Sequence, residues 1–542
     1  MTPSANIVLT GGRVWCGKVE GVAEAVALWN GVVLATGSAD EIAPLIGPDT
    51  RVIELEGRMA TPGLNDAHLH LLPLGLAMAA VDVRANTAPT LAELKAAIRA
   101  RAEVTPKGQW IFARGYDQTR FQSRLHPTAD DLDEAAPDHP VYLMRTCGHL
   151  SVVNTRAMEL AGLTPETPVP HGGVIEQKDG RLTGLLAENG RAPVEAVLPQ
   201  PSEEHLVAAI ERAGRYCLSL GITSVMDAAV GMICGARELA AYRTAQRTGR
   251  LPVRTYQCLL GDPPHGIAQE AAAEGLITGH GCDMLRIGPV KIFTDGSAGG
   301  RTAAMTKPYL SEPEVYGVLT YEDADCHAEI ARFHGLGYQM AIHAIGDAAI
   351  EQVLAGYEKA LDHKPLPERR HRIEHCGFVT PDQRARMKRL GLIAAPQPSF
   401  IYEMGDGYFE LFDEARRDAC YPLRTFIEDG LVPSASTDTP VTDANTFNNI
   451  FTMLTRQTRT GAVIGPDQTV SLDEALHAYT WSSAFGEHAE HRKGRLVPGQ
   501  LADVAVFSHD LSALSPEEIR DEAACDLTIR GGEIVYQREG MA

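Results

Sequence analysis

Apolar runs alternate with helix-like segments through the middle of the chain. The helix-like segments include residues 202–221 and residues 381–391, and Thr380 is a predicted N-cap for the second. Eight apolar or β-prone runs are strand candidates, and they begin at Thr61, Ile222, Pro252, Ile287, Tyr338, His371, Leu392 and Val432. Eight strands that alternate with helices predict an α/β fold of the (β/α)8 TIM-barrel type.

Both ends of the chain have a different pattern, with short β-prone runs around glycine-containing turns. The N-terminal runs lie within residues 1–60 and the C-terminal runs within residues 496–542. Because two β-rich ends flank one long barrel region, we expect a small β-sandwich domain built from both termini. The barrel domain then spans residues 61–495.

One interval in the barrel region is too long for a single crossover. About 150 residues separate the first two strand candidates, whereas a βα unit takes about 30. The interval predicts a large insertion after the first barrel strand, an inserted subdomain at about residues 80–215. Long βα loops lie over the catalytic face of a barrel, so we expect the insertion to cover the site. A packing or oligomerisation arm is the alternative.

Polar residues with metal-binding side chains stand where the predicted strands end. The pair His68 and His70 projects to one side, because strand residues two apart share a face. From His343 to His375 is 375 − 343 = 32 residues, close to one βα unit of about 30. The carboxyl ends of barrel strands meet at one rim. The candidate metal ligands there are His68, His70, Lys291, His343, His375 and Asp438.

Composition narrows the function classes. The chain has 542 residues, 44% hydrophobic and 22% charged, which is a globular mix. Its 49 basic and 70 acidic residues give a net charge of −21, which opposes binding to nucleic acid or an anionic membrane surface. No apolar segment is long enough to cross a membrane, and the first residues do not form a secretory signal, so we expect a cytoplasmic protein.

The order His-X-His, Lys, His, His, Asp resembles the amidohydrolase superfamily. The surrounding text is similar to its amidohydrolase-3 type branch, which includes N-substituted formamide deformylases and other metal-dependent hydrolases. The resemblance covers nearly the whole chain and differs at Ala67, where the family more often has Ser or Cys. The motifs that carry it include "TPGLNDAHLHLLPLG", "VKIFTDGSAGGRTA", "AIHAIGD", "RIEHC" and "LVPGQLADVAVF".

Neutral imidazoles and carboxylates suit a divalent metal, with zinc the first expectation and iron or manganese as alternatives. His68, His70 and Asp438 are candidates to hold one ion, and His343 and His375 a second. The resemblance implies that Lys291 is carboxylated, so that its carbamate bridges two ions. A Schiff-base lysine, as in barrel aldolases, is the competing interpretation.

The resemblance implies an enzyme that hydrolyses an amide-type C–N bond (N-acyl, N-formyl or cyclic amide) of a small molecule with metal-activated water. We expect Asp438 and Lys291 to be catalytic, with Asp438 as the proton shuttle. Tyr116, His149 and Arg301 are candidate substrate-binding residues, although a salt bridge is an equal alternative for Arg301.

Two other functions stay open. One is a hydrolase of the same fold that acts on another bond, as a deaminase, ester or lactone hydrolase. The other is a non-catalytic regulatory member. No Gly-x-Ser-x-Gly occurs, which argues against a serine hydrolase. Relatives of this kind are often dimers, so a homodimer or higher oligomer is also open.

Overall fold

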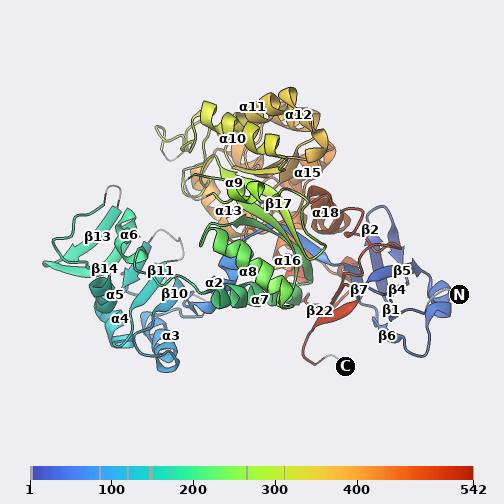
Figure 1. The fold of residues 1–542 in the computed structure, drawn as a ribbon, viewed down its shortest axis with the longest axis horizontal. Helices are drawn as coiled ribbons and strands as arrows, with labels where there is room; N and C mark the ends of the chain where they lie inside the picture. The colour runs from blue at the N-terminus through green and yellow to red at the C-terminus, as the bar shows by residue number, and fades with distance from the viewer. Residues whose placement is uncertain are drawn as a thin grey trace. The chain divides into compact units, whose positions relative to one another are not determined.

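The computed structural model describes residues 4–84, 87–118, 121–145, 150–170, 173–263, 266–310 and 312–540. Within these residues the central sheet has seven parallel strands, in the order β20-β19-β18-β17-β16-β15-β8. Figure 1 labels β17 of this sheet. The strands are almost wholly buried, as expected for parallel strands covered on both faces. They are β8 (Leu64–Leu69), β15 (Ile222–Val230), β16 (Arg254–Leu260), β17 (Leu285–Phe293), β18 (Met340–Ala344), β19 (Arg372–His375) and β20 (Ile393–Ala395).

The eighth position of the barrel is filled by residues 434–439 without a regular strand. Asp438 N donates a hydrogen bond to His68 O at the end of β8 (2.7 Å). On the other side, Ser434 N donates to Ala394 O of β20 (3.4 Å). The segment therefore lies between the two edge strands and nearly closes the barrel. The barrel prediction is confirmed. The prediction of a regular eighth strand was wrong, because residues 434–439 form only isolated hydrogen bonds with β8 and β20.

Helices connect the barrel strands, and their ends follow capping chemistry. The helix predicted after Thr380 is confirmed: the Thr380 hydroxyl accepts from Gln383 N, and the Gln383 side chain accepts from Thr380 N. Gly391 ends this helix in the left-handed conformation. The longer helices are α7 (Glu203–Ser219), α8 (Ala236–Arg247), α10 (Asp323–Leu336), α11 (Asp347–His363), α12 (Pro381–Leu390), α13 (Ser399–Leu411) and α16 (Thr446–Thr455).

Two further sheets contain the ends of the chain, and one of them combines strands from both ends. β7 (Met59–Pro62) pairs antiparallel with β21 (Val504–Phe507), so N-terminal and C-terminal strands share one sheet (Figure 1). This sheet also contains β2 (Arg13–Gly17), β3 (Gly21–Ala23), β22 (Cys525–Arg530) and β23 (Glu533–Gln537). The other sheet contains β1 (Ile7–Thr10), β4 (Ala25–Trp29), β5 (Val32–Gly37) and β6 (Arg51–Glu54). Apolar side chains of both sheets form one core, which makes the predicted β-sandwich.

Residues 75–209 form a second compact unit, separate from the unit of residues 1–74 and 210–542. Its sheet has the order β13-β14-β12-β11-β10-β9, and helices α3 (Leu91–Val104) and α4 (Ala129–Ala135) accompany it. The strands are β9 (Val81–Asp82), β10 (Ile111–Tyr116), β11 (Val141–Arg145), β12 (Leu150–Val153), β13 (Gly173–Lys178) and β14 (Arg181–Glu188). This unit has its own apolar core, and that core includes Leu94, Ile98 and Leu143. The chain thus carries a large insertion after the first barrel strand.

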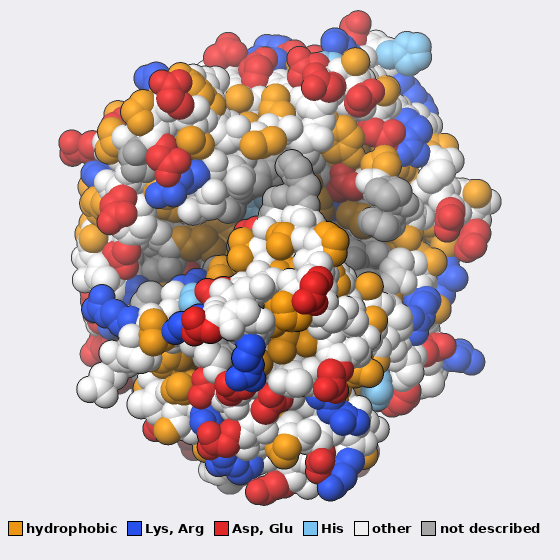
Figure 2. Space-filling model, turned by 90° about the vertical axis from the view of Figure 1, so that its left-hand side faces the viewer, with side chains coloured by type: hydrophobic (Ala, Val, Ile, Leu, Met, Phe, Trp, Pro, Cys, Tyr) orange, Lys and Arg blue, Asp and Glu red, His pale blue; other side chains and the backbone are white. Residues whose placement is uncertain are grey.

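The surface mixes both signs of charge. Figure 2 shows acidic and basic side chains interspersed over one face of the molecule. Among the described residues, every helix is too short or too polar to cross a lipid bilayer.

Candidate metal centre

His68, the fifth residue of β8, is fully buried, and each of its ring nitrogens faces a carboxylate. Nδ1 lies 2.5 Å from Glu374 Oε2. Because a carboxylate only accepts hydrogen bonds, Nδ1 carries the proton and Nε2 keeps its lone pair. Nε2 lies 3.3 Å from Asp438 Oδ1, an approach that lacks hydrogen-bond alignment. The lone pair of His68 is thus directed toward Asp438.

Glu374 is itself held in place by a buried arginine. Arg372, two residues earlier on β19, donates from Nε to Glu374 Oε1 (2.6 Å), and its guanidinium also donates to Ala67 O (2.9 Å). Burial favours the neutral form of Glu374, but the Arg372 charge and His68 outweigh it and hold the pKa of Glu374 well below its ordinary value. Glu374 is therefore a carboxylate that fixes the His68 tautomer.

His375 ends β19 in the left-handed region, with φ of +69°. Its Nδ1 lies 2.6 Å from Gln397 Oε1. The Gln397 amide nitrogen donates to Ala395 O and to Ser436 Oγ, both at 3.0 Å, so the amide oxygen is the atom that faces His375. Nδ1 of His375 therefore carries the proton, and Nε2 keeps its lone pair. Burial, followed by the neighbouring His343, lowers the pKa of His375 well below its ordinary value, so the ring is neutral.

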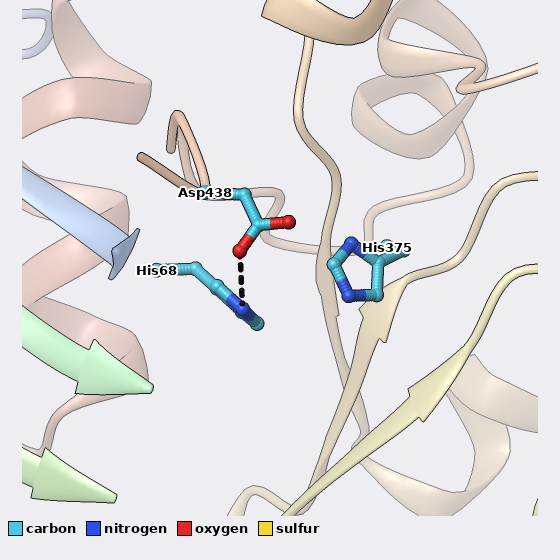
Figure 3. A group of neighbouring side chains, drawn as sticks. All are labelled: His68, His375 and Asp438. Carbon is cyan, nitrogen blue, oxygen red and sulfur yellow. Dashed lines mark ion pairs between the residues drawn. The ribbon is translucent and has the colours of Figure 1, made fainter. Parts of the chain in front are cut away.

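Asp438 brings a carboxylate to the same place from the irregular eighth segment. Its Oδ1 lies 3.1 Å from His70 Nε2 as well as 3.3 Å from His68 Nε2. The Asp438 side chain is buried, and within the described residues its Oδ1 makes no hydrogen bond. One ligand atom each from His68, His375 and Asp438 lie within 4.8 Å of one another (Figure 3). Zinc binds nitrogen and oxygen ligands at about 2.0–2.2 Å, so two ligands of one ion lie up to about 4.4 Å apart, and these three atoms are close to that spacing.

His343 and Lys291 complete the set on the two preceding strands. His343 Nε2 lies 3.1 Å from Gly296 O, which only accepts, so Nδ1 keeps the lone pair. The His343 ring lies 4.3 Å from the His375 ring between centroids. Lys291 is completely buried on β17, and its Nζ lies 4.7 Å above the centre of the Phe293 ring. Burial lowers the pKa of Lys291, which moves the amine toward its neutral form.

All six residues line one cavity of about 350 Å³ in the barrel unit. Within the part of the chain that the structure describes, five of them carry a buried polar atom without a hydrogen-bond partner: His68 Nε2, His70 Nδ1, Lys291 Nζ, His343 Nδ1 and Asp438 Oδ1. Buried polar atoms are bonded in more than about nine cases of ten. Five unbonded atoms in one cavity, with neutral imidazoles and a carboxylate among them, fit a divalent cation as the missing partner.

The three substrate-binding candidates have different surroundings. Arg301 NH1 pairs with Glu312 Oε1 at 2.9 Å, and Arg301 is not among the described residues that line the cavity. Tyr116 is buried in the inserted unit, where its hydroxyl lies 3.0 Å from His126 Nδ1. His149 lies outside the described residues. A substrate contact for each of them stays a prediction.

Three supporting residues were missing from the ligand set proposed from sequence. Glu374 orients His68, Gln397 orients His375, and Asp295 Oδ1 lies 3.3 Å from His343 Nε2. Asp295 also accepts from Ile345 N and Gly346 N (3.0 and 2.8 Å), so it shapes the loop after β18. Each of the three polar side chains stands at or just beyond a predicted strand end, which was the available signal.

A parallel barrel with a candidate cation site at the carboxyl ends of its strands defines the class of the protein. Residues 51–536 match the model of the amidohydrolase family, and the chain belongs to this family.

The chain is similar over its full length to proteins of this family. YtcJ of Bacillus subtilis is 28% identical over 521 residues, which cover 95% of this chain and 96% of that protein. The N-substituted formamide deformylase of Arthrobacter pascens is 27% identical over 552 residues, which cover 100% and 98%. The crystal structure of an uncharacterized metal-dependent hydrolase from Pyrococcus horikoshii superposes with a TM-score of 0.78 at 28% identity, covering 94% and 99%. These comparisons confirm the predicted resemblance.

Proposed function

We propose that this protein is a metal-dependent hydrolase that breaks an amide-type C–N bond (N-acyl, N-formyl or cyclic amide) in a small molecule. The observation that carries the proposal is the convergence of His68, His375 and Asp438 on one buried point, with lone pairs and a carboxylate oxygen directed there. The similarity to an N-substituted formamide deformylase supports the choice of bond.

His68, His375 and Asp438 would hold one ion, and His70, His343 and Lys291, which line the same cavity, are further candidate ligands for this ion or a second. Zinc suits this donor set best, while iron and manganese are alternatives. When bound, a divalent ion acts as a Lewis acid that acidifies water and polarises a carbonyl group. Lys291 is a buried amine with a lowered pKa, so a neutral nitrogen is available to take up CO2 and form a carbamate.

Asp438 is the proton carrier in this proposal. Its buried Oδ1 has no hydrogen-bond donor within the described residues, so this carboxylate oxygen is available to accept a proton from the attacking water. The water oxygen bonds to the carbonyl carbon, the C–N bond breaks, and Asp438 delivers the proton to the leaving nitrogen. Glu374 and Gln397 are positioning residues. They keep His68 and His375 in the tautomers whose Nε2 lone pair can bind a metal ion.

The proposal is tested with Asp438→Asn in the zinc-loaded protein. We expect kcat/KM for the best amide substrate to fall about 10²- to 10⁴-fold. Asp443→Asn is the matched control, because Asp443 lies only five residues after Asp438 but is exposed. This variant should keep the activity of the unmodified protein. Full activity of Asp438→Asn would exclude the proton-carrier role.

A substrate panel separates the amide proposal from other bonds on the same fold. It contains N-formyl amines, N-acetyl amines and lactams, together with esters, lactones and aminopyrimidines. Turnover of the esters, lactones or aminopyrimidines alone would overturn the choice of an amide bond but keep the metal-dependent hydrolase. Metal content is measured on the same preparation by elemental analysis.

A further inference from the structure

The cavity beside the candidate metal centre has apolar walls. Apart from the six proposed metal-site residues, most of the described lining residues are apolar or aromatic. Six of them are Met232, Phe293, Ile345, Phe400, Met404 and Val441. Surfaces of this kind gain from contact with apolar groups and give a charged group no compensation for lost hydration.

Charge in these walls is confined to the metal-site residues. Among the described residues that line the cavity, the only lysine is Lys291, the only aspartate is Asp438, and arginine and glutamate do not occur. Apart from the metal centre, the described lining residues would therefore offer no cation to the carboxylate of an N-acyl amino acid. Arg301 is a residue type that could bind such a carboxylate, but its guanidinium group is paired with Glu312.

One buried hydroxyl in the apolar wall has no well-aligned partner among the described residues. Tyr421 lines the cavity, is 1% exposed, and its hydroxyl makes no well-aligned hydrogen bond within the described part of the chain, with the Tyr408 hydroxyl as its polar neighbour. Burial, followed by the neighbouring Tyr408, raises the pKa of Tyr421, so the hydroxyl keeps its proton and remains a donor. A buried donor without an acceptor is destabilising in the free protein, which points to an acceptor on a bound molecule.

Tyr421 is connected to the metal centre through one aromatic ring. Phe400 stacks on His375, with ring centroids 5.7 Å apart and an interplanar angle of 14°. Tyr421 packs edge-on against Phe400, with centroids also 5.7 Å apart. Tyr421 N donates to Gly377 O (2.7 Å), which fixes the residue against the chain that follows His375. These contacts hold Tyr421 in the cavity wall next to Phe400, which itself packs on the proposed metal ligand His375.

We infer that the site is selective for neutral amides with an aryl or other apolar substituent, and that Tyr421 is a specificity-determining residue that donates a hydrogen bond to the amide oxygen. We assign the amide oxygen as the acceptor of this hydrogen bond, because the apolar substituent of such a substrate contains no hydrogen-bond acceptor. This inference rests on the proposed amide hydrolysis and adds the substrate class to it.

The test compares two amides that differ only in a carboxylate. N-Acetyl-2-phenylethylamine is the neutral probe, and N-acetylphenylalanine carries the additional α-carboxylate. We expect the zinc-loaded protein to prefer the neutral probe by at least about 100-fold in kcat/KM, because beyond the metal centre the described walls offer the carboxylate no counter-charge. Equal rates, or a preference for N-acetylphenylalanine, would overturn the inference while leaving amide hydrolysis intact.

A binding measurement separates this failure from failure of the proposed function. If neither probe is hydrolysed, amide hydrolysis is the part that fails for these substrates. Calorimetric titration of the same zinc-loaded protein with both probes still decides the inference: tighter binding of the neutral probe supports it, and equal or tighter binding of the carboxylate overturns it.

Tyr421→Phe tests the hydroxyl, with Tyr338→Phe as the matched control. We expect Tyr421→Phe to lower kcat/KM for the neutral probe about 10-fold or more, while zinc content and thermal midpoint are retained. Tyr338 donates to Ala268 O (3.1 Å) and Leu276 O (2.6 Å) outside the cavity, so Tyr338→Phe should lower the thermal midpoint and leave kcat/KM unchanged. Unchanged kcat/KM in Tyr421→Phe would exclude the proposed role of this hydroxyl.

Discussion

Glu374 Oε2 and His68 Nδ1 lie 2.5 Å apart, although 306 residues separate them in the chain. The contact joins the first and the sixth barrel strand at the level of the candidate metal centre. It fixes which nitrogen of His68 is protonated, and it places a negative charge behind the ring. A carboxylate in this position makes an imidazole a better metal ligand.

We expect Glu374→Gln to weaken zinc binding about 10- to 100-fold, because the negative charge behind His68 is lost. Competition with a chelator of known affinity measures the change. The variant also leaves Arg372 buried without its counter-charge, which should lower the free energy of unfolding by roughly 3–5 kcal/mol.

The control for this loss of stability is Arg254→Met. It breaks the buried ion pair between Arg254 and Asp503 (2.6 Å). Arg254 is the first residue of β16, at the end of the strand away from the candidate metal centre. This variant should be destabilised without a change in zinc affinity. Equal zinc affinity of Glu374→Gln and the unmodified protein would contradict the orienting role of Glu374.

Gln397→Leu should release His375 from its fixed tautomer. The substitution removes the acceptor for Nδ1 with little change in volume, so we expect zinc affinity to fall about 10-fold. Gln397→Glu keeps an acceptor in the same place and should restore much of the affinity. Equal affinities of the two variants would show that the hydrogen bond to His375 does not matter.

Lys291→Met separates function from stability. The buried amine has no hydrogen-bond partner, so its replacement should leave the thermal midpoint of the metal-free protein unchanged or raise it. Activity with the best substrate should fall by about 100-fold or more if Lys291 contributes to the metal centre.

Lys493→Met is the matched control for this effect on stability. Lys493 is partly buried and pairs with Glu487 at 2.7 Å, so its removal should lower the midpoint. Differential scanning calorimetry compares the two variants. A large destabilisation by Lys291→Met would mean that the lysine is structural.

Glu474 should make stability depend on pH. Burial opposes its charge, but Arg424, Ser471 and Lys18 outweigh it and hold the pKa of Glu474 at about 2, against an ordinary value of 4.5. A lowered folded-state pKa contributes stability above the unfolded value, and this contribution is lost as pH falls from 4.5 toward 2. The protein should exceed Glu474→Gln in unfolding free energy by ~2–3 kcal/mol at pH 6. Thermal midpoints between pH 6 and 3 should converge, and a constant difference would contradict the assignment.

The barrel could be predicted from sequence because buried parallel strands are continuous apolar runs, and the runs at β17 and β18 are clear examples. The eighth segment was misjudged as a regular strand. Residues 434–439 read Ser-Ala-Ser-Thr-Asp-Thr, and their side chains form hydrogen bonds that compete with a regular ladder. Thr437 Oγ1, for example, donates to Asp66 Oδ2 at 2.6 Å.

The six metal-site candidates could be selected because each stands near the end of a predicted strand, and all six line one cavity. Their role as ligands stays a prediction. Their supporting partners could not be selected in the same way, because the sequence does not show which strand ends face each other. Glu374 meets His68 across the barrel, and Gln397 reaches His375 from the next strand, so both contacts required the folded chain.

The irregular eighth segment also has a consequence for synthesis of the chain. Asp438 N bonds to His68 O, and His70 N bonds to Thr439 O (2.7 and 2.8 Å), so residues 370 positions apart hold each other in place. A ribosome-bound intermediate that ends before residue 434 contains the four histidines of the candidate metal centre but lacks these hydrogen bonds and the Asp438 carboxylate. We expect such a fragment to leave the cation in solution, so that capture of the ion coincides with closure of the barrel.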